Sequence, residues 1–392
     1  MYQLAIDWQR AQVRPWLEGG REIARGLPAG DALRATFEHW LTNLEAGRPQ
    51  DLRISARIEA ETGRRITDET LLDEPFVRVS RLRAAGTGAR RQLLLVAPYS
   101  GYATHVAGPL IAALLEHTDV VVTEWRDARL VPLAAGGFGF DRQVEVVTRV
   151  LRQIGPEVDV VSISQGTLPA LVALALLAED GAPAARSLAL LAGPLDPTRN
   201  PPPGTLLPPM VPFDWIELLA FQPVGSEDPG AGRLVFPGLA QLLLIAASHP
   251  GDYLQAQVGS WIETYEGRVN GWSRSLADLH AVSDIPAELA RDMMQLVFRD
   301  LALVRGTLEL AGRRVQPERL EGLALLTVEA GNDALVGPGQ THAAHGLCPR
   351  IANANRAWVT LKDAEHYDLF TGPKIKREVV PTLEAFFARI TP

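Results

Sequence analysis

A serine stands where an apolar stretch gives way at once to a helical pattern. The segment VDVVSIS, residues 158–164, continues directly into QGTLPALVALALLAED, so Ser164 is the central residue of SISQG. A tight strand-to-helix turn of the form G-x-S-x-G exposes a serine hydroxyl above a sheet, and it needs small residues two positions to either side. Ser162 and Gly166 meet that need, with serine replacing the first glycine. Ser164 is therefore the candidate nucleophile, and the alternative is that it only caps the following helix.

A serine nucleophile needs an acid and a base further along the chain. ALLTVEAGNDALVG has the pattern of a strand followed by a loop with Asp333, and RAWVTLKDAEHYDLF that of a strand followed by a loop with His366. Both residues follow strand ends, where catalytic loops gather in open α/β sheets. We predict that His366 is the base for Ser164 and that Asp333 orients its imidazole.

Other side chains compete for these two roles. The competitors are His105, His342 and His345 for the base, and Glu329, Asp363, Glu365 and Asp368 for the acid. His366 is preferred because it follows the last predicted strand. Asp333 is preferred because Glu329 is expected within its strand, while Asp363 and Glu365 are too close in sequence to His366 to face its Nδ1 easily.

Acyl transfer also needs hydrogen-bond donors for an oxyanion. The backbone N–H of Gln165 is at the start of the predicted helix and is one candidate. The loop after the first core strand, APYSGYATH, supplies the second through the backbone N–H of Tyr99 or Ser100. The alternative is that this loop is an ordinary turn without a catalytic role, because Pro and Ser-Gly are common in turns.

Short apolar strands alternate with helices around these residues. The predicted strands are 92–99, 119–125, 158–164, 187–196, 324–330 and 356–363, and the clearest predicted helices between and after them are 141–155, the segment following 166, and 379–390. Such alternation indicates a mainly parallel sheet covered on both faces. With the serine turn, it predicts an α/β-hydrolase fold.

The alternation is interrupted once, by a proline cluster at 199–212 and several helical segments. We therefore expect a helical extension at 1–76, a first core part at 77–197, a largely helical lid insertion at 198–318 and a second core part at 319–392. The 392 residues then form one hydrolase core with additions rather than two independent domains.

Composition excludes several classes of protein. A single cysteine, Cys348, excludes internal disulfides and multi-cysteine metal sites, and a net charge of −8 argues against nucleic-acid binding. The N-terminal residues lack a signal-peptide pattern, because Asp7, Arg10 and Arg14 interrupt it. The longest apolar run, 168–178, has about half of the ~20 residues that a membrane span needs. We expect a soluble, cytoplasmic protein without a transmembrane segment.

The chain resembles the intracellular polyhydroxybutyrate (polyhydroxyalkanoate) depolymerases along nearly its whole length. The resemblance rests on VAPYSGYAT, DARLVPLAAGGFGFD, ISQG, AGPLDPTRNP, VFPGLAQ, VEAGNDALVGPGQTHAAHGLC and HYDLF. It implies an α/β-hydrolase fold and hydrolysis of ester bonds in stored poly(3-hydroxybutyrate). Matched by motif, Ser164 is at the nucleophile position, Asp333 at the acid and His366 at the base. Several members of the family have cysteine at the nucleophile position, and this chain has serine there.

The resemblance implies a polyester granule or its oligomers as partner and a cytoplasmic location at such granules. We expect no metal and no organic cofactor, and we expect Tyr102, Phe213 and Trp215 to contact the substrate. Two other functions stay open: an esterase or thioesterase for small soluble substrates, and a granule-binding protein without activity. The sequence also leaves open the oligomeric state, which could be a homodimer, and the length of the products. It does not decide whether coenzyme A can accept the acyl group.

Overall fold

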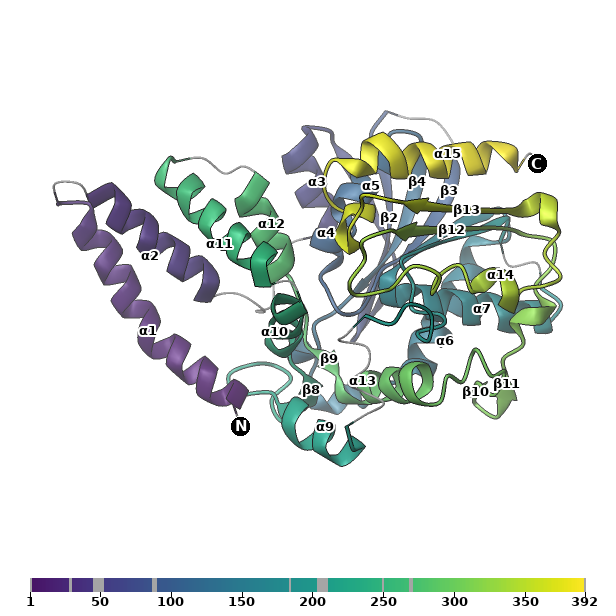
Figure 1. Ribbon diagram of the computed structural model, residues 1–392, viewed down its shortest axis with the longest axis horizontal. Coiled ribbons are helices and arrows are strands. Elements are labelled where there is room, and N and C mark those ends of the chain that lie inside the picture. Colours follow the sequence, from purple (N-terminus) through teal and green to yellow (C-terminus); the bar gives the residue numbers. More distant parts are fainter. Residues whose placement is uncertain are drawn as a thin grey trace.

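An eight-stranded sheet forms the centre of the protein, as the computed structural model shows (Figure 1). The structure describes residues 2–27, 30–44, 53–86, 90–182, 185–202, 211–248, 250–267 and 271–390. The strands are β1 (Ile66–Glu74), β2 (Val77–Ala84), β3 (Arg91–Val96), β4 (Thr118–Trp125), β5 (Val158–Ile163), β6 (Ser187–Leu191), β12 (Ala324–Ala330) and β13 (Arg356–Leu361). Their order is β1-β2-β4-β3-β5-β6-β12-β13, and β2 alone runs antiparallel to both of its neighbours. This order confirms the predicted α/β-hydrolase fold.

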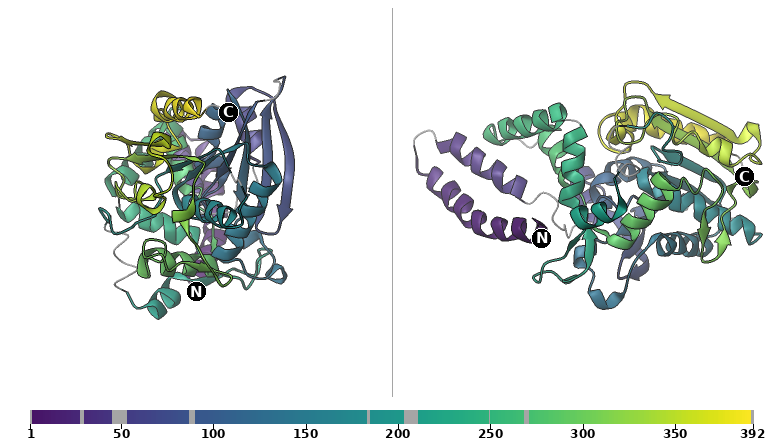
Figure 2. Two further views of the ribbon diagram at one scale, coloured as in Figure 1. Left: turned by 90° about the vertical axis from the view of Figure 1, so that its right-hand side faces the viewer. Right: turned by 60° about the horizontal axis from the view of Figure 1, so that its bottom comes forward.

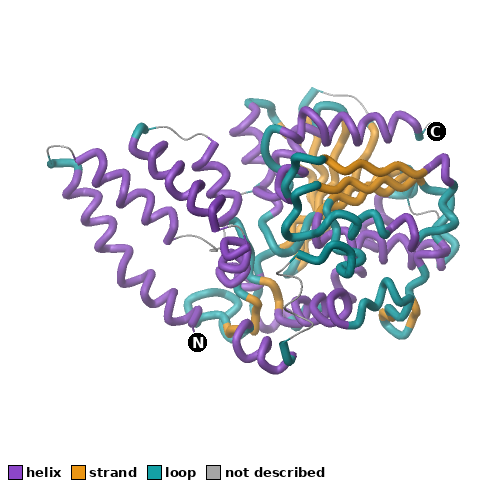
Figure 3. Tube along the Cα trace, in the orientation of Figure 1, coloured by secondary structure: helices purple, strands orange, loops and turns teal. Residues whose placement is uncertain are grey.

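Helices cover both faces of the sheet (Figures 1 and 3). One face carries α3 (Ile54–Thr62), α5 (Gly108–Leu114) and α15 (Val380–Arg389), and the other carries α6 (Phe140–Ile154) and α7 (Thr167–Glu179). The central strands β3, β5 and β6 are almost continuous apolar runs because they are buried on both sides. Helix α7 is apolar around its whole circumference, because it packs on β5 and β6, on α6 and on the turn at Pro317–Arg319.

The predicted helical extension at 1–76 is wrong over its last part. Residues 66–74 form β1, which pairs antiparallel with β2 at the edge of the sheet. The segment ITDETLLDE is rich in charged residues and partly exposed, as protected edge strands often are. Such a strand lacks the apolar run by which the buried strands were recognised, so its sequence did not reveal it.

The first two helices stand apart from the sheet (Figure 1 and the right-hand view of Figure 2). They are α1 (Tyr2–Ala24) and α2 (Gly30–Leu44), and they pack against each other. Helix α2 also packs on α11 (Pro250–Tyr265), where Trp261 Nε1 donates to Thr36 Oγ1 at 3.0 Å. The N-terminal hairpin is therefore attached to the insertion rather than to the core.

The segment between β6 and β12 is mainly helical. It contains α9 (Phe213–Ala220), α10 (Gly238–Ser248), α11, α12 (Gly271–His280) and α13 (Ala287–Met293). It also contains a small antiparallel sheet of β7 (Gln222–Pro223), β8 (Leu234–Phe236) and β9 (Ile285–Pro286), and a hairpin of β10 (Glu309–Leu310) and β11 (Arg313–Arg314), none of which the sequence predicted. Of the proline cluster, residues 203–210 lie outside the described residues. Within the described part, no helix is both long and apolar enough to cross a membrane.

Three buried histidines make the stability of the fold sensitive to acid. His105, in α4 (Ala103–Val106), His280, and His345, in α14 (Ala344–Leu347), are each less than 8% exposed. Burial lowers the pKa of His105 to about 3 and those of His280 and His345 to about 4. Asp127 has the opposite effect on the pH dependence of stability, because burial raises its pKa to about 6.

We expect the free energy of unfolding to fall as the pH drops from 6.5 towards 4. Over this range the histidines are neutral in the folded chain and protonated in the unfolded chain, so each contributes a slope of up to about 1.4 kcal/mol per pH unit. Denaturant titrations at several pH values measure it. His345→Gln removes one titrating group, so its slope should be shallower than that of the wild type. A slope identical to that of the wild type would show that His345 does not contribute to the acid sensitivity.

Candidate active site

Three side chains far apart in the sequence are linked by two hydrogen bonds. Ser164 follows β5, Asp333 follows β12 and His366 follows β13. His366 Nε2 lies 3.0 Å from Ser164 Oγ, and His366 Nδ1 lies 2.7 Å from Asp333 Oδ2. Asp333 and His366 are both 6% exposed. The structure thus brings together the three residues that the sequence proposed for nucleophile, acid and base, in the geometry that proton transfer from Ser164 requires.

The serine turn has the strain of a tight strand-to-helix connection. Ser164 has a φ of +49°, in the left-handed region that side chains other than glycine rarely adopt. Only glycine fits at position 166, because the Cβ of any other residue would lie 2.5 Å from the carbonyl oxygen of Val96 at the end of β3. Ser162 is fully buried, and its hydroxyl finds no hydrogen-bond partner among the described residues. A strained backbone held by close packing is what exposes the Ser164 hydroxyl.

The carboxylate of Asp333 is fixed on both oxygens. Oδ1 accepts hydrogen bonds from the backbone N–H of Leu335 at 2.8 Å and of Val336 at 2.7 Å. This leaves Oδ2 facing His366. The imidazole is also held by its ring neighbours, since Tyr367 and Phe370 meet it edge-on at 5.4 and 5.2 Å between ring centres.

Three of the four competing carboxylates are engaged elsewhere. Glu329 lies within β12, as expected, and its Oε1 accepts hydrogen bonds from the backbone N–H groups of residues 339, 341 and 342. Glu365 and Asp368 form a capping box around the short helix that begins at His366. These carboxylates shape the loops on which the site is built.

The runner-up histidines do not contact Ser164. His345 Nε2 lies 3.1 Å from Thr327 Oγ1 in β12, and His342 packs against His345 and Trp358. His105 Nδ1 lies 3.1 Å from Thr104 Oγ1. The only cysteine, Cys348, is fully buried, and burial raises the pKa of its thiol to about 12.

Two of the three expected oxyanion donors are already engaged in this structure. The backbone N–H groups of Tyr99 and Ser100 donate to Gln165 Oε1 at 3.0 and 3.2 Å. One oxygen with two backbone donors is the arrangement that an oxyanion would need. The side chain of Gln165 thus occupies the N–H groups of Tyr99 and Ser100, whose role as oxyanion donors stays a prediction.

Ser164 opens into a narrow pocket between the core and the insertion. Its lining residues are Pro98, Ser100, Gly101, Val106, Ser164, Asp278, Ala281, Val282, His366, Tyr367 and Phe370. The insertion is tied to the loop after β3, because Gly101 pairs with Val282 and the N–H of Tyr102 donates to Ala281 at 3.0 Å. Sequence reasoning missed Asp278 and Tyr367. Only the HYDLF motif gave a signal for Tyr367, and none marked Asp278.

The structure does not bring the three expected substrate contacts to this pocket. Tyr102 is not among the residues that line this pocket, and its hydroxyl donates to buried Asp127. Phe213 lies in α9 under the guanidinium of Arg299, and Trp215 is 64% exposed on the same helix. This hydrogen bond holds the Tyr102 ring, and the substrate contact expected of Tyr102 stays a prediction. Phe213 and Trp215 are on a surface outside the pocket.

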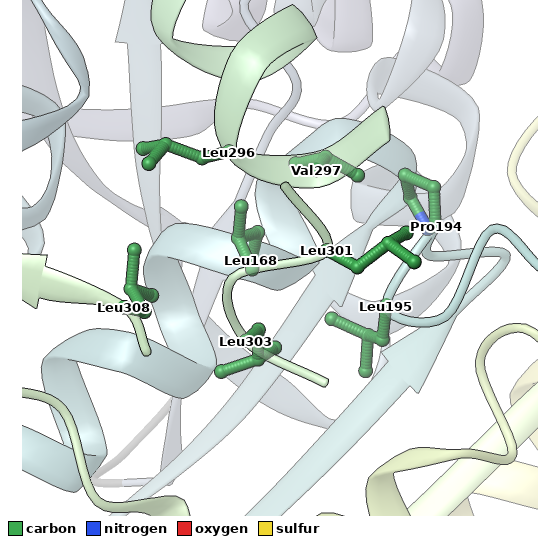
Figure 4. Close-up of a pocket in the computed structure, with 8 residues that line it drawn as sticks. All are labelled: Leu168, Pro194, Leu195, Leu296, Val297, Leu301, Leu303 and Leu308. Atoms are coloured by element: carbon green, nitrogen blue, oxygen red, sulfur yellow. The ribbon is translucent and has the colours of Figure 1, made fainter. Parts of the chain in front are cut away.

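A second pocket borders the first turn of α7 and is entirely apolar (Figure 4). Its lining residues are Leu168, Pro194, Leu195, Leu296, Val297, Leu301, Leu303 and Leu308. Their side chains come from α7, from the loop after β6 and from the end of the insertion. No described side chain in this lining is polar, so the pocket has no group that could orient a reacting ester.

The strand order and the strained serine turn place the chain among the α/β-hydrolases. The family described next, whose model matches about half of the chain, makes it an ester hydrolase. A family model described as PHB de-polymerase C-terminus matches residues 192–391, about half of the chain. The chain belongs to this family.

Solved structures of other hydrolases are similar at low sequence identity. An α/β-hydrolase fold protein from Nakamurella multipartita is 15% identical, with 83% of this chain and 99% of that chain covered and a TM-score of 0.44. The esterase domain of a Rhodothermus marinus protein is 14% identical, with coverages of 83% and 98% and a TM-score of 0.42. An esterase from Pyrococcus furiosus is 11% identical, with coverages of 84% and 95% and a TM-score of 0.42. No curated protein matches the chain.

Proposed function

We propose that the protein hydrolyses ester bonds of poly(3-hydroxybutyrate), or of a similar short-chain polyhydroxyalkanoate, at Ser164. The observation that carries this proposal is the hydrogen-bonded chain from Asp333 through His366 to Ser164 at the pocket, in a member of the PHB depolymerase family. A location at polyester granules follows from the same proposal.

The reaction proceeds by two acyl transfers. His366 Nε2 takes the proton of Ser164 as Oγ attacks the ester carbonyl, and Asp333 holds Nδ1–H and stabilises the imidazolium. The imidazolium then protonates the leaving alkoxide, which is the hydroxyl end of the departing polymer segment. In the second half, His366 activates water, which hydrolyses the acyl-serine and releases the hydroxyacyl product.

Incubation with native amorphous poly(3-hydroxybutyrate) granules tests the substrate. We expect 3-hydroxybutyrate or short oligomers as products, and none from a Ser164→Ala variant. Cleavage of p-nitrophenyl butyrate without granule hydrolysis would make the protein an esterase for small soluble substrates. Granule binding without any product, and no labelling of Ser164 by a fluorophosphonate, would indicate a binding protein instead.

Gln165 provides a test of the oxyanion donors. Its side-chain oxygen has to leave before the N–H groups of Tyr99 and Ser100 can stabilise an oxyanion. We expect Gln165→Ala to raise kcat/KM for p-nitrophenyl butyrate by about 2- to 10-fold, because two hydrogen bonds no longer compete with the substrate. Steady-state kinetics measures this change. A loss of activity would show that the side chain anchors the loop and does not block it.

An apolar surface on α9 provides a test of granule contact. Trp215, Leu218 and Leu219 are 64%, 78% and 64% exposed. We expect Trp215→Ser to lower the rate on granules at least about threefold, because burial of an aromatic ring against polyester is lost, and to leave p-nitrophenyl butyrate hydrolysis unchanged. Trp358, 61% exposed on β13, gives the matched control Trp358→Ser. Equal effects on both substrates would contradict a granule contact at α9.

A further inference from the structure

Besides Ser100, two polar side chains line the Ser164 pocket without belonging to the triad. Asp278, in α12, reaches the pocket from the insertion, and its side chain is 17% exposed. Its Oδ1 accepts a hydrogen bond from Arg57 Nη2 of α3 at 3.2 Å. Arg57 is held in turn by Glu61, whose Oε1 lies 2.8 Å from Nε. A charged group from the insertion is therefore kept at the pocket by an ion pair with the core.

Tyr367 is the second of these side chains. It lines the same pocket, and its ring packs edge-on against His366 and Phe370. Among the described residues, no group forms a hydrogen bond with its hydroxyl. Burial raises the pKa of Tyr367 to about 12, and the charges of Asp333 and Asp278 act in the same direction. The hydroxyl therefore keeps its proton and is available as a donor.

The rest of the pocket wall away from the serine turn is mostly apolar. Pro98, Val106, Ala281, Val282 and Phe370 supply it. A carboxylate acceptor and a phenol donor in such a wall suit a ligand group that both donates and accepts a hydrogen bond. A free hydroxyl is such a group. An ester oxygen can only accept, and a ligand carboxylate would be repelled by Asp278.

We propose that Asp278 and Tyr367 form a subsite for the free hydroxyl of a 3-hydroxyacyl group whose carbonyl is attacked by Ser164. This subsite rests on the proposed function, because it assigns the chain end that the polyester hydrolase accepts. The hydroxyl donates to the Asp278 carboxylate and accepts from the Tyr367 hydroxyl. Interior units have an esterified oxygen at this position and lack the hydrogen to donate, so the enzyme prefers to cleave from the hydroxyl end.

Three p-nitrophenyl esters test the subsite on the full-length protein: 3-hydroxybutyrate, 3-methoxybutyrate and butyrate. The methoxy ester keeps the acceptor oxygen and lacks the donor. We expect the wild type to favour the hydroxy ester over the methoxy ester in kcat/KM by about 10- to 100-fold, because the lost hydrogen bond leaves a carboxylate unpaired with substrate. A ratio near one would overturn the proposal.

Two variants assign the preference to its residues. Asp278→Asn should lower kcat/KM for the hydroxy ester by about tenfold and leave the butyrate ester within about twofold. Tyr367→Phe keeps the ring that packs on His366 and should lower kcat/KM for the hydroxy and methoxy esters by a clearly larger factor than for butyrate. Equal losses on all three esters would indicate a merely structural role and would overturn the proposal. If Asp278→Asn fails to fold, Tyr367→Phe and the wild-type ratio still decide.

Glu69→Gln is the matched control, because it removes an ion pair with Arg81 at the sheet edge and touches neither the pocket nor Arg57. We expect it to leave the ratio of kcat/KM for the hydroxy ester to that for the methoxy ester unchanged.

The ester ratios do not involve polymer, so the polyester substrate and the hydroxyl subsite can be overturned independently of each other. No release of product from granules with the ratios as expected would overturn the polyester substrate alone. Granule hydrolysis with a hydroxy-to-methoxy ratio near one would overturn the subsite alone.

Discussion

Ser164→Ala should reduce kcat for ester hydrolysis by about 10⁴- to 10⁶-fold, the largest effect we expect from any single substitution. Alanine removes the oxygen that lies 3.0 Å from His366 Nε2 and leaves no atom that could form an acyl-enzyme. Hydrolysis of p-nitrophenyl butyrate and of polymer granules should be lost together, because both depend on the same nucleophile. Near-normal turnover on either substrate would remove Ser164 from the mechanism.

The same position provides its own folding control. Alanine at a φ of +49° is strained like serine, so Ser164→Ala should unfold at nearly the same denaturant concentration as the wild type. Glycine adopts this conformation without strain, and Ser164→Gly should be more stable than Ser164→Ala by about 1 kcal/mol while being equally inactive. An inactive variant that is also largely unfolded would make the kinetic result uninformative, and circular dichroism with denaturant titration distinguishes the two cases.

Asp333→Asn should lower kcat by about 10⁴-fold, and the hydrogen bonds around the carboxylate give the reason. The backbone N–H groups of Leu335 and Val336 both donate to Oδ1, so an asparagine would keep its carbonyl oxygen at that position. Its NH₂ group would then face His366 Nδ1 and donate to it. The proton of the neutral imidazole would move to Nε2, which could no longer accept the proton of Ser164.

Asp368→Asn is the control for this prediction. Asp368 is also an acidic residue of the His366 loop, but its carboxylate accepts from the backbone N–H of Glu365 and belongs to the capping box. We expect Asp368→Asn to cost about 1 kcal/mol in unfolding free energy and to leave kcat within a few-fold. If both asparagine variants lose activity equally, the effect comes from loop disorder and not from the imidazole tautomer.

The buried strands and the three residues of the candidate triad could be proposed from the sequence because their constraints are local. A strand covered on both faces has to be apolar, so β3, β5, β6 and β12 were recognisable as runs. The serine turn needs a residue without a Cβ at 166, and the acid and base have to follow strand ends. These requirements involve only residue type and order along the chain.

Features set by contacts between distant segments were not accessible. β1 is an edge strand whose polar sequence satisfies pairing with β2 alone, and the short strands β7 to β9 form only because they meet one another. Tyr102 was expected to contact the substrate, and the structure shows its hydroxyl bound to Asp127, 25 residues away in sequence. Nothing in the residues next to Tyr102 specifies that partner.

The sequence by itself thus determined the class of fold, the candidate nucleophile and the order of acid and base, because strand burial and tight turns restrict residue type. Only the tertiary structure decided what surrounds the candidate nucleophile. It placed the Gln165 side chain on the N–H groups of Tyr99 and Ser100, and it brought Asp278 from the insertion into the pocket. These are contacts between surfaces distant in sequence, and their geometry follows from how the insertion packs on the core.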